Sequence, residues 1–156
     1  MSIDRRRSPA AIVLTVAALL AACGLAGQPA PVESATTYHG TIQRSCAPWD
    51  GAALAVNLDR SSGRGPDQLQ IQLWRATLPA PAEVLALPEQ SAGGGQVFIC
   101  DGVPDCAAAE RARLVFESAP DDPTVRGRLQ ASWPGQPGLE VRFSATWAEQ
   151  QAVLCG

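Results

Sequence analysis

The sequence contains few of the side chains that most often carry out chemistry. Its 156 residues include one histidine, His39, and no lysine, so that all 12 basic residues are arginine. A Ser-His-Asp or Cys-His mechanism would have to use His39, and no G-x-S-x-G segment accompanies it. We therefore expect His39 to be an exposed or hydrogen-bonded strand residue, and we expect the protein not to be an enzyme.

Aromatic and basic side chains are also scarce. Besides four tryptophans there are one tyrosine and three phenylalanines, too few for an aromatic platform that stacks sugars or bases. The 12 arginines are outnumbered by 15 acidic residues. Because nucleic-acid binding requires a basic face that replaces counterions on phosphates, the composition argues against a nucleic-acid partner.

The sequence also lacks a long apolar run. A helix needs about 20 apolar residues to cross a membrane, and the stretch Ala10–Ala22 is shorter. It follows three basic residues, Arg5 to Arg7, and ends in small residues before Cys23. This order of a basic end, an apolar segment and small residues is typical of a signal peptide.

The end of that stretch, Leu20-Ala21-Ala22-Cys23, resembles the lipobox of bacterial lipoproteins. The resemblance implies that residues 1–22 are removed as a signal peptide and that the Cys23 thiol and the new amino terminus are acylated, with palmitate for example. Two or more chains hold a protein stably, because each buried methylene contributes about 0.8 kcal/mol. Glycine rather than aspartate at position 24 implies an outer membrane, facing the periplasm. The alternative is an ordinary secretory signal that happens to contain a cysteine.

The remaining chain predicts one acidic domain on a tether. Removal of 22 residues leaves 134, with nine basic and 14 acidic residues and a formal net charge near −5. Residues 23–36 are small and rich in proline, which predicts a flexible tether. Residues 37–156 are long enough for a single β-domain with a moderate core.

Four cysteines remain after Cys23, and an even number in an exported chain indicates two disulfides. Of the three possible pairings we favour Cys46–Cys155 and Cys100–Cys106. In the chain-entropy model the long loop contributes about 4.7 kcal/mol and the short loop about 2, so the long bridge matters more to stability. Zinc or redox sites usually contain C-x₂-C, whereas the closest pair here is C-x₅-C. We therefore expect no metal site, and no cofactor other than the covalent lipid.

Alternation of apolar and polar residues predicts strands. It is clearest in Gln68–Leu73, Val125–Trp133 and Leu139–Trp147. Residues 134–138, PGQPG, predict a turn that makes the last two a β-hairpin. Cross-strand ion pairs are expected on its wet face, between Glu140 or Glu149 and Arg126 or Arg128.

Weaker patterns complete the predicted fold. The whole indicates an all-β protein, a small antiparallel sandwich or barrel of about seven or eight strands stapled by disulfides and preceded by a signal-peptide helix. One helical turn is expected at Ala82–Leu87 within an irregular connection, and Ala107–Arg113 could begin as a helix. The weaker strands are Tyr38–Cys46, Ala52–Asp59, Gln96–Cys100, Ala112–Ser118 and Ala152–Cys155.

Two loops are the best candidates for contact surfaces. One is the turn Ala47–Gly51, where Trp49 and Asp50 either anchor a partner or cover the end of the core. The other is CDGVPDC, where Asp101 and Asp105 could accept a calcium ion, although their spacing matches no EF-hand. Six aspartates could supply paired carboxylates for hydrolysis, but their positions at turns and strand ends are explained more simply by turn chemistry: Asp50, Asp59, Asp101, Asp105, Asp121 and Asp122.

Two functions follow from these observations. The first is a lipid-anchored envelope protein that acts as a non-enzymatic binding or assembly module for an envelope protein or ligand. The second is a lipid-anchored periplasmic hydrolase that uses carboxylates or His39. The position of His39 distinguishes them, because catalysis needs an acid and a hydroxyl within hydrogen-bond reach in a cleft.

Overall fold

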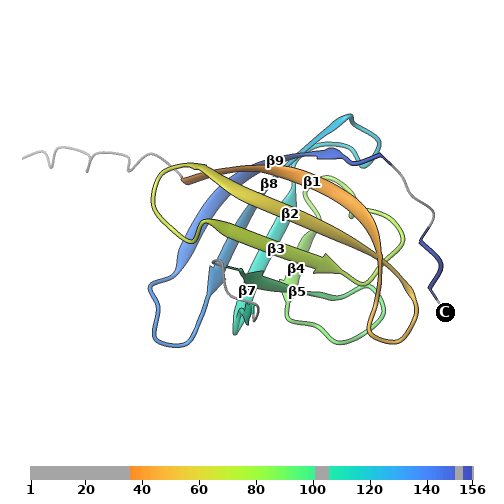
Figure 1. Ribbon diagram of the computed structural model, residues 1–156, viewed down its shortest axis with the longest axis horizontal. Coiled ribbons are helices and arrows are strands. Elements are labelled where there is room, and N and C mark those ends of the chain that lie inside the picture. Colours follow the sequence, from red (N-terminus) through yellow and green to blue (C-terminus); the bar gives the residue numbers. More distant parts are fainter. Residues whose placement is uncertain (1–35, 101–105, 150–152, 156) are drawn as a thin grey trace, which may run out of the picture. The chain divides into compact units, whose positions relative to one another are not determined.

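The protein folds as a single β-sheet. A computed structural model describes residues 36–100, 106–149 and 153–155 (Figure 1). No helix in these ranges is long and apolar enough to span a membrane. The expected signal-peptide helix, Cys23 and the tether lie outside the described residues, apart from Thr36. The described residues form nine strands: β1 (Thr36–Cys46), β2 (Ala52–Ser62), β3 (Gln68–Leu73), β4 (Val84–Leu87), β5 (Gly95–Ile99), β6 (Ala107–Ala108), β7 (Arg111–Phe116), β8 (Thr124–Ser132) and β9 (Leu139–Trp147).

The strands follow the order β4-β7-β8-β9-β1-β2-β3-β5-β6, and the sheet curls into a half-barrel (Figure 1). The all-β, disulfide-stapled fold expected from the sequence is confirmed. Neighbouring strands are antiparallel, including the β8–β9 hairpin, with one exception. The exception is β1, which pairs with β9 in parallel, from Thr36 opposite Val141 to Ile42 opposite Trp147.

A short connection brings the two ends of the sheet together. Only Ala109 and Glu110 separate β6, at one edge, from β7, next to the other edge. The Ala109 amide donates to the Val97 carbonyl of β5 (2.7 Å), and the Glu110 amide donates to the Ser132 carbonyl of β8 (2.9 Å). Backbone hydrogen bonds therefore span the gap that a curled, open sheet would otherwise leave.

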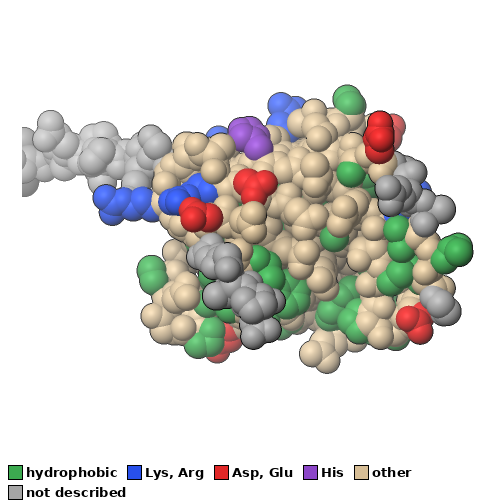
Figure 2. Space-filling view, in the orientation of Figure 1, with side chains coloured by type: hydrophobic (Ala, Val, Ile, Leu, Met, Phe, Trp, Pro, Cys, Tyr) green, Lys and Arg blue, Asp and Glu red, His purple; other side chains and the backbone are tan. Residues whose placement is uncertain are grey.

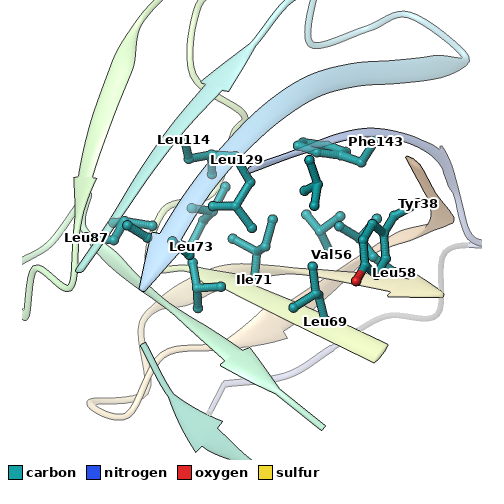
Figure 3. Packing of buried hydrophobic residues seen from close by; sticks show 14 of the residues in the cluster. Tyr38, Val56, Leu58, Leu69, Ile71, Leu73, Leu87, Leu114, Leu129 and Phe143 are labelled. Atoms are coloured by element: carbon teal, nitrogen blue, oxygen red, sulfur yellow. The ribbon is translucent and has the colours of Figure 1, made fainter. Parts of the chain in front are cut away.

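The inside of the curled sheet is filled with apolar side chains. Figure 3 shows side chains from opposite walls of the curled sheet pointing toward one another. The largest of them are fully buried. Tyr38 satisfies its hydroxyl by donating to the Pro66 carbonyl (2.6 Å). Residues Ser34–Gly156 form one compact unit around this core. The core includes Tyr38, Ile42, Leu54, Val56, Leu58, Leu69, Ile71, Leu73, Leu114, Phe116, Leu129 and Val141.

Two glycines allow the strands to approach closely where the sheet curls. A Cβ atom at Gly40 in β1 would lie 1.8 Å from the Asn57 carbonyl oxygen of β2. A Cβ atom at Gly127 in β8 would lie 2.5 Å from Cζ of Phe143. Glycine inside a strand marks such close approach, because no side chain keeps the neighbouring strand away.

Both expected disulfides are present. Cys46, the last residue of β1, is bonded to Cys155, with Cα atoms 5.6 Å apart. Cys100, which follows β5, is bonded to Cys106, with Cα atoms 4.5 Å apart. The strand expected at the C-terminus is wrong for Val153–Cys155, which lie outside any strand. There the disulfide, rather than a backbone ladder, attaches the chain end to the sheet.

The helical turn expected at Ala82–Leu87 is wrong. Val84–Leu87 forms the edge strand β4, which pairs with β7 and buries Leu87 in the core. Ala82 has φ 65°, outside the right-handed helical region. Glu83 accepts hydrogen bonds from the Arg75 side chain and from the Ala80 amide. The bond from Arg75, and to a smaller extent the bond from Ala80, lowers the pKa of the Glu83 carboxyl below its ordinary value. Tertiary pairing thus overrides the local helix preference.

The alternative of a helix at Ala107–Arg113 is also wrong. Ala107 and Ala108 pair with β5, and the chain continues as β7 from Arg111. In β7 the buried side chains of Ala112 and Leu114 alternate with the exposed side chains of Arg111 and Arg113, which is the period of a strand.

Candidate functional site

The turn between β1 and β2 presents Trp49 in a fixed backbone. The Ala47 amide donates to the Gly51 carbonyl (2.8 Å), and the Asp50 amide donates to the Ala47 carbonyl (3.0 Å). Asp50 has φ 61°, a left-handed conformation that aspartate tolerates better than most residues. The Cys46–Cys155 bond lies directly before this turn. Asp50 is therefore a turn residue, as turn chemistry predicted.

A second tryptophan holds Trp49 in place. The ring of Trp74 contacts that of Trp49 edge to face, with centroids 5.0 Å apart and planes at 70°. Trp74 is 8% exposed and packs on Ala47 and Ala53, whereas Trp49 is 46% exposed. Within the described residues the buried Trp74 Nε1 has no hydrogen-bond partner. Trp49 thus partly covers a small cluster and leaves half of its own ring open to solvent.

Two apolar residues near the C-terminus add to this end of the domain. Val153 is half-exposed and Leu154 is 93% exposed. The next residue, Cys155, is bonded to Cys46, which directly precedes the turn. Val153 lines a depression with Gln43 and Arg44 of β1. We call Trp49, Val153 and Leu154 the Trp49 surface. The three exposed apolar side chains are linked through the Cys46–Cys155 bond, and exposed apolar side chains are typical of contact sites.

His39 lies elsewhere, on the outer face of β1. Its Nδ1 is 2.5 Å from Oγ of Ser144 on β9, and Asp59 of β2 lies opposite it in the strand register. Figure 2 shows the histidine (purple) at the surface, with acidic side chains (red) close by. The sheet thus brings a serine, a histidine and an aspartate together on three neighbouring strands.

The geometry of this group differs from that of a catalytic triad. In a triad the serine contacts Nε2 and a buried aspartate accepts from Nδ1. Here Ser144 contacts Nδ1, and the Asp59 carboxylate accepts a hydrogen bond from Gln68 (3.0 Å). His39 is exposed on the sheet face rather than enclosed in a cleft. The arrangement matches the expectation of a hydrogen-bonded strand histidine.

Of the remaining predicted site residues, the structure describes only some. Cys23, Asp101 and Asp105 lie outside the described residues, so the lipid and calcium expectations stay predictions. Asp122 accepts a hydrogen bond from the Ala119 amide (3.0 Å), as turn chemistry predicts. No group of three or more possible metal-ligating side chains is found in the described part of the chain.

Sequence reasoning missed three residues of these sites. Ser144 was predicted to be on the wet face of its strand, but its contact with His39 depends on the parallel β1–β9 pairing. Val153 and Leu154 were assigned to a strand, although the disulfide prediction already placed them near the Trp49 turn.

Comparison of the chain with protein-family models, curated proteins and solved structures finds no match.

We expect Ser144 not to act as a nucleophile. With its hydroxyl on Nδ1 of an exposed histidine, the serine lacks the orientation that activates it in hydrolases. A fluorophosphonate probe that labels activated serines should leave the protein unmodified when both of its disulfides are formed. Labelling of the wild type that disappears in both Ser144→Ala and His39→Ala would contradict this interpretation.

Proposed function

We propose that the chain is a lipid-anchored protein of the cell envelope that acts as a non-enzymatic binding or assembly module. The lipobox ending at Cys23 supports the anchor, and Gly24 supports an outer-membrane location facing the periplasm. Two disulfides agree with an exported protein, because thiols stay reduced in the cytosol.

The observation that carries the binding role is the half-exposed Trp49 on a rigid turn. Hydrogen bonds fix the backbone of the turn, Trp74 contacts the Trp49 ring, and Cys46, the residue directly before the turn, is part of a disulfide. A preordered aromatic side chain loses little conformational entropy on binding, which is why such residues dominate many interfaces. The interior is filled by core side chains, so a ligand or partner would bind outside the curled sheet.

The second candidate, a hydrolase, is favoured by the 2.5 Å contact between Ser144 and His39. The orientation described above weighs against it. We therefore place the Trp49 surface first and envisage an envelope protein as its partner.

Lipid anchoring is tested by Cys23→Ser. We expect the variant to lose labelling by radioactive palmitate and to accumulate with residues 1–22 still attached, because the lipid-dependent cleavage requires the thiol. Cells producing the wild-type chain are the control. A lipid-labelled, normally cleaved product from Cys23→Ser would show that another residue carries the anchor.

The binding role is tested by site-specific photo-cross-linking in intact cells. A photoreactive amino acid at Trp49 should give a discrete adduct, whereas the same group at Gln136, an exposed residue of the β8–β9 turn, should not. Leu154→Ser should weaken the Trp49 adduct severalfold, since it removes apolar area from the same surface. Equal cross-linking at both positions would contradict a specific partner at Trp49.

A further inference from the structure

The outer face of β7, β8 and β9 collects most of the positive charge of the domain. Strand alternation points five exposed arginines outward from these three neighbouring strands. The mature chain has nine arginines and a net charge near −5, so this distribution is strongly one-sided. We call these residues the arginine face: Arg111, Arg113, Arg126, Arg128 and Arg142.

The arginines of this face lack the acidic partners that the sequence predicted. Glu140 lies opposite Gln130, and no salt bridge joins Glu140 or Glu149 to Arg126 or Arg128 among the described residues, so the expected ion pairs are wrong. Arg128 pairs with Glu117, with Nε and Oε1 2.6 Å apart. In the described ranges of the chain, no salt bridge involves the other four members of the face.

The strand register places two of the positive charges directly across from each other. Arg142 of β9 lies opposite Arg128 of β8, and Arg126 is the next outward residue of β8. Like charges at directly opposed positions destabilise a sheet. An anion bound here would offset that repulsion and thereby stabilise the sheet.

Two shallow depressions on the face could receive anionic groups. One, of about 440 Å³, is lined by Arg111 and Arg113 together with Gln130, Ser132 and Glu140. The other, of about 380 Å³, is lined by Arg126, Arg142, Thr37 and Ser144, with Glu117 at its side. Arginine presents its donors in a planar fork that suits phosphate oxygens.

The start of the domain lies beside this face. Thr36, the first described residue, pairs with Val141, and Thr37 pairs with Arg142. Thirteen residue steps lead from Cys23 to Thr36, and they span at most about 45 Å. A lipid on Cys23 would therefore keep Thr36, and the Arg142 end of the arginine face beside it, within about 45 Å of the membrane.

We infer that the arginine face docks on anionic phosphate headgroups of the membrane that holds the lipid anchor. This inference rests on the proposed anchor for its proximity to the membrane. The net negative charge of the domain does not prevent docking, because charges more than about 8 Å away are largely screened at physiological ionic strength. Docking would fix the orientation of the tethered domain, with the arginine face toward the membrane.

The test uses the chain from residue 24, exported through an ordinary cleavable signal so that both disulfides form. It should sediment with vesicles of 70% phosphatidylcholine and 30% phosphatidylglycerol and not with pure phosphatidylcholine. Binding should disappear as salt is raised to about 0.5 M. Because each arginine near an anionic surface contributes roughly fivefold, Arg126→Gln with Arg142→Gln should weaken binding about 30-fold.

The matched control is Arg44→Gln with Arg75→Gln, which removes the same charge elsewhere and should change binding less than threefold. An unchanged or higher thermal midpoint would show that the Arg126/Arg142 variant is folded. Equal weakening by both variants, or no binding to the anionic vesicles, would overturn the inference. Binding to polyglutamate but not to vesicles would also overturn it and assign the face to an acidic polypeptide. Palmitate labelling of Cys23 is independent of all these outcomes, so the anchor can stand if docking fails.

Discussion

The parallel pairing of β1 with β9 is the interaction on which the rest of the structure depends. In the strand order it joins β4-β7-β8-β9 to β1-β2-β3-β5-β6, so it is the ladder between the two halves of the sheet. The Ala148 amide extends the ladder by donating to the Ile42 carbonyl (2.9 Å), and beyond it the Cys46–Cys155 bond joins the end of β1 to the C-terminal segment. Tyr38 and Phe143, opposite each other across the ladder, are both buried in the shared core.

The arginine face and His39 adjoin this ladder, and the Trp49 turn follows at the far end of β1. At its start Thr37 lies beside Arg142 of the arginine face, and His39 meets Ser144 two residues later. The far end of β1 leads into the Trp49 turn. Eleven strand residues extend over about 30 Å, so the tether and the Trp49 surface belong to opposite ends of the strand. We envisage a domain held at the membrane by its first end, with Trp49 available to a partner at the other.

The sequence predicted the strands with a clear local pattern and both disulfides, and it failed where the alignment of distant strands decides the structure. Strict alternation located β3, β8 and β9, and cysteine spacing gave both disulfides. Strand β4 was missed because Val84–Leu87 has little strand pattern of its own and is extended only by pairing with β7. The same limit applies to the sites. The Trp49 turn could be located from Asp-Gly, but its contact with Trp74 and the Ser144–His39 pair depend on how remote strands align.

Native-state hydrogen exchange of the β1 amides tests the central role of the β1–β9 ladder most directly. If this ladder joins the two halves, the amides of Thr37–Ile42 should exchange only through global unfolding, as slowly as those of β8 and β9. Exchange of β1 by local opening while β8 and β9 stay protected would contradict the account, because the two halves would then be held together by something else.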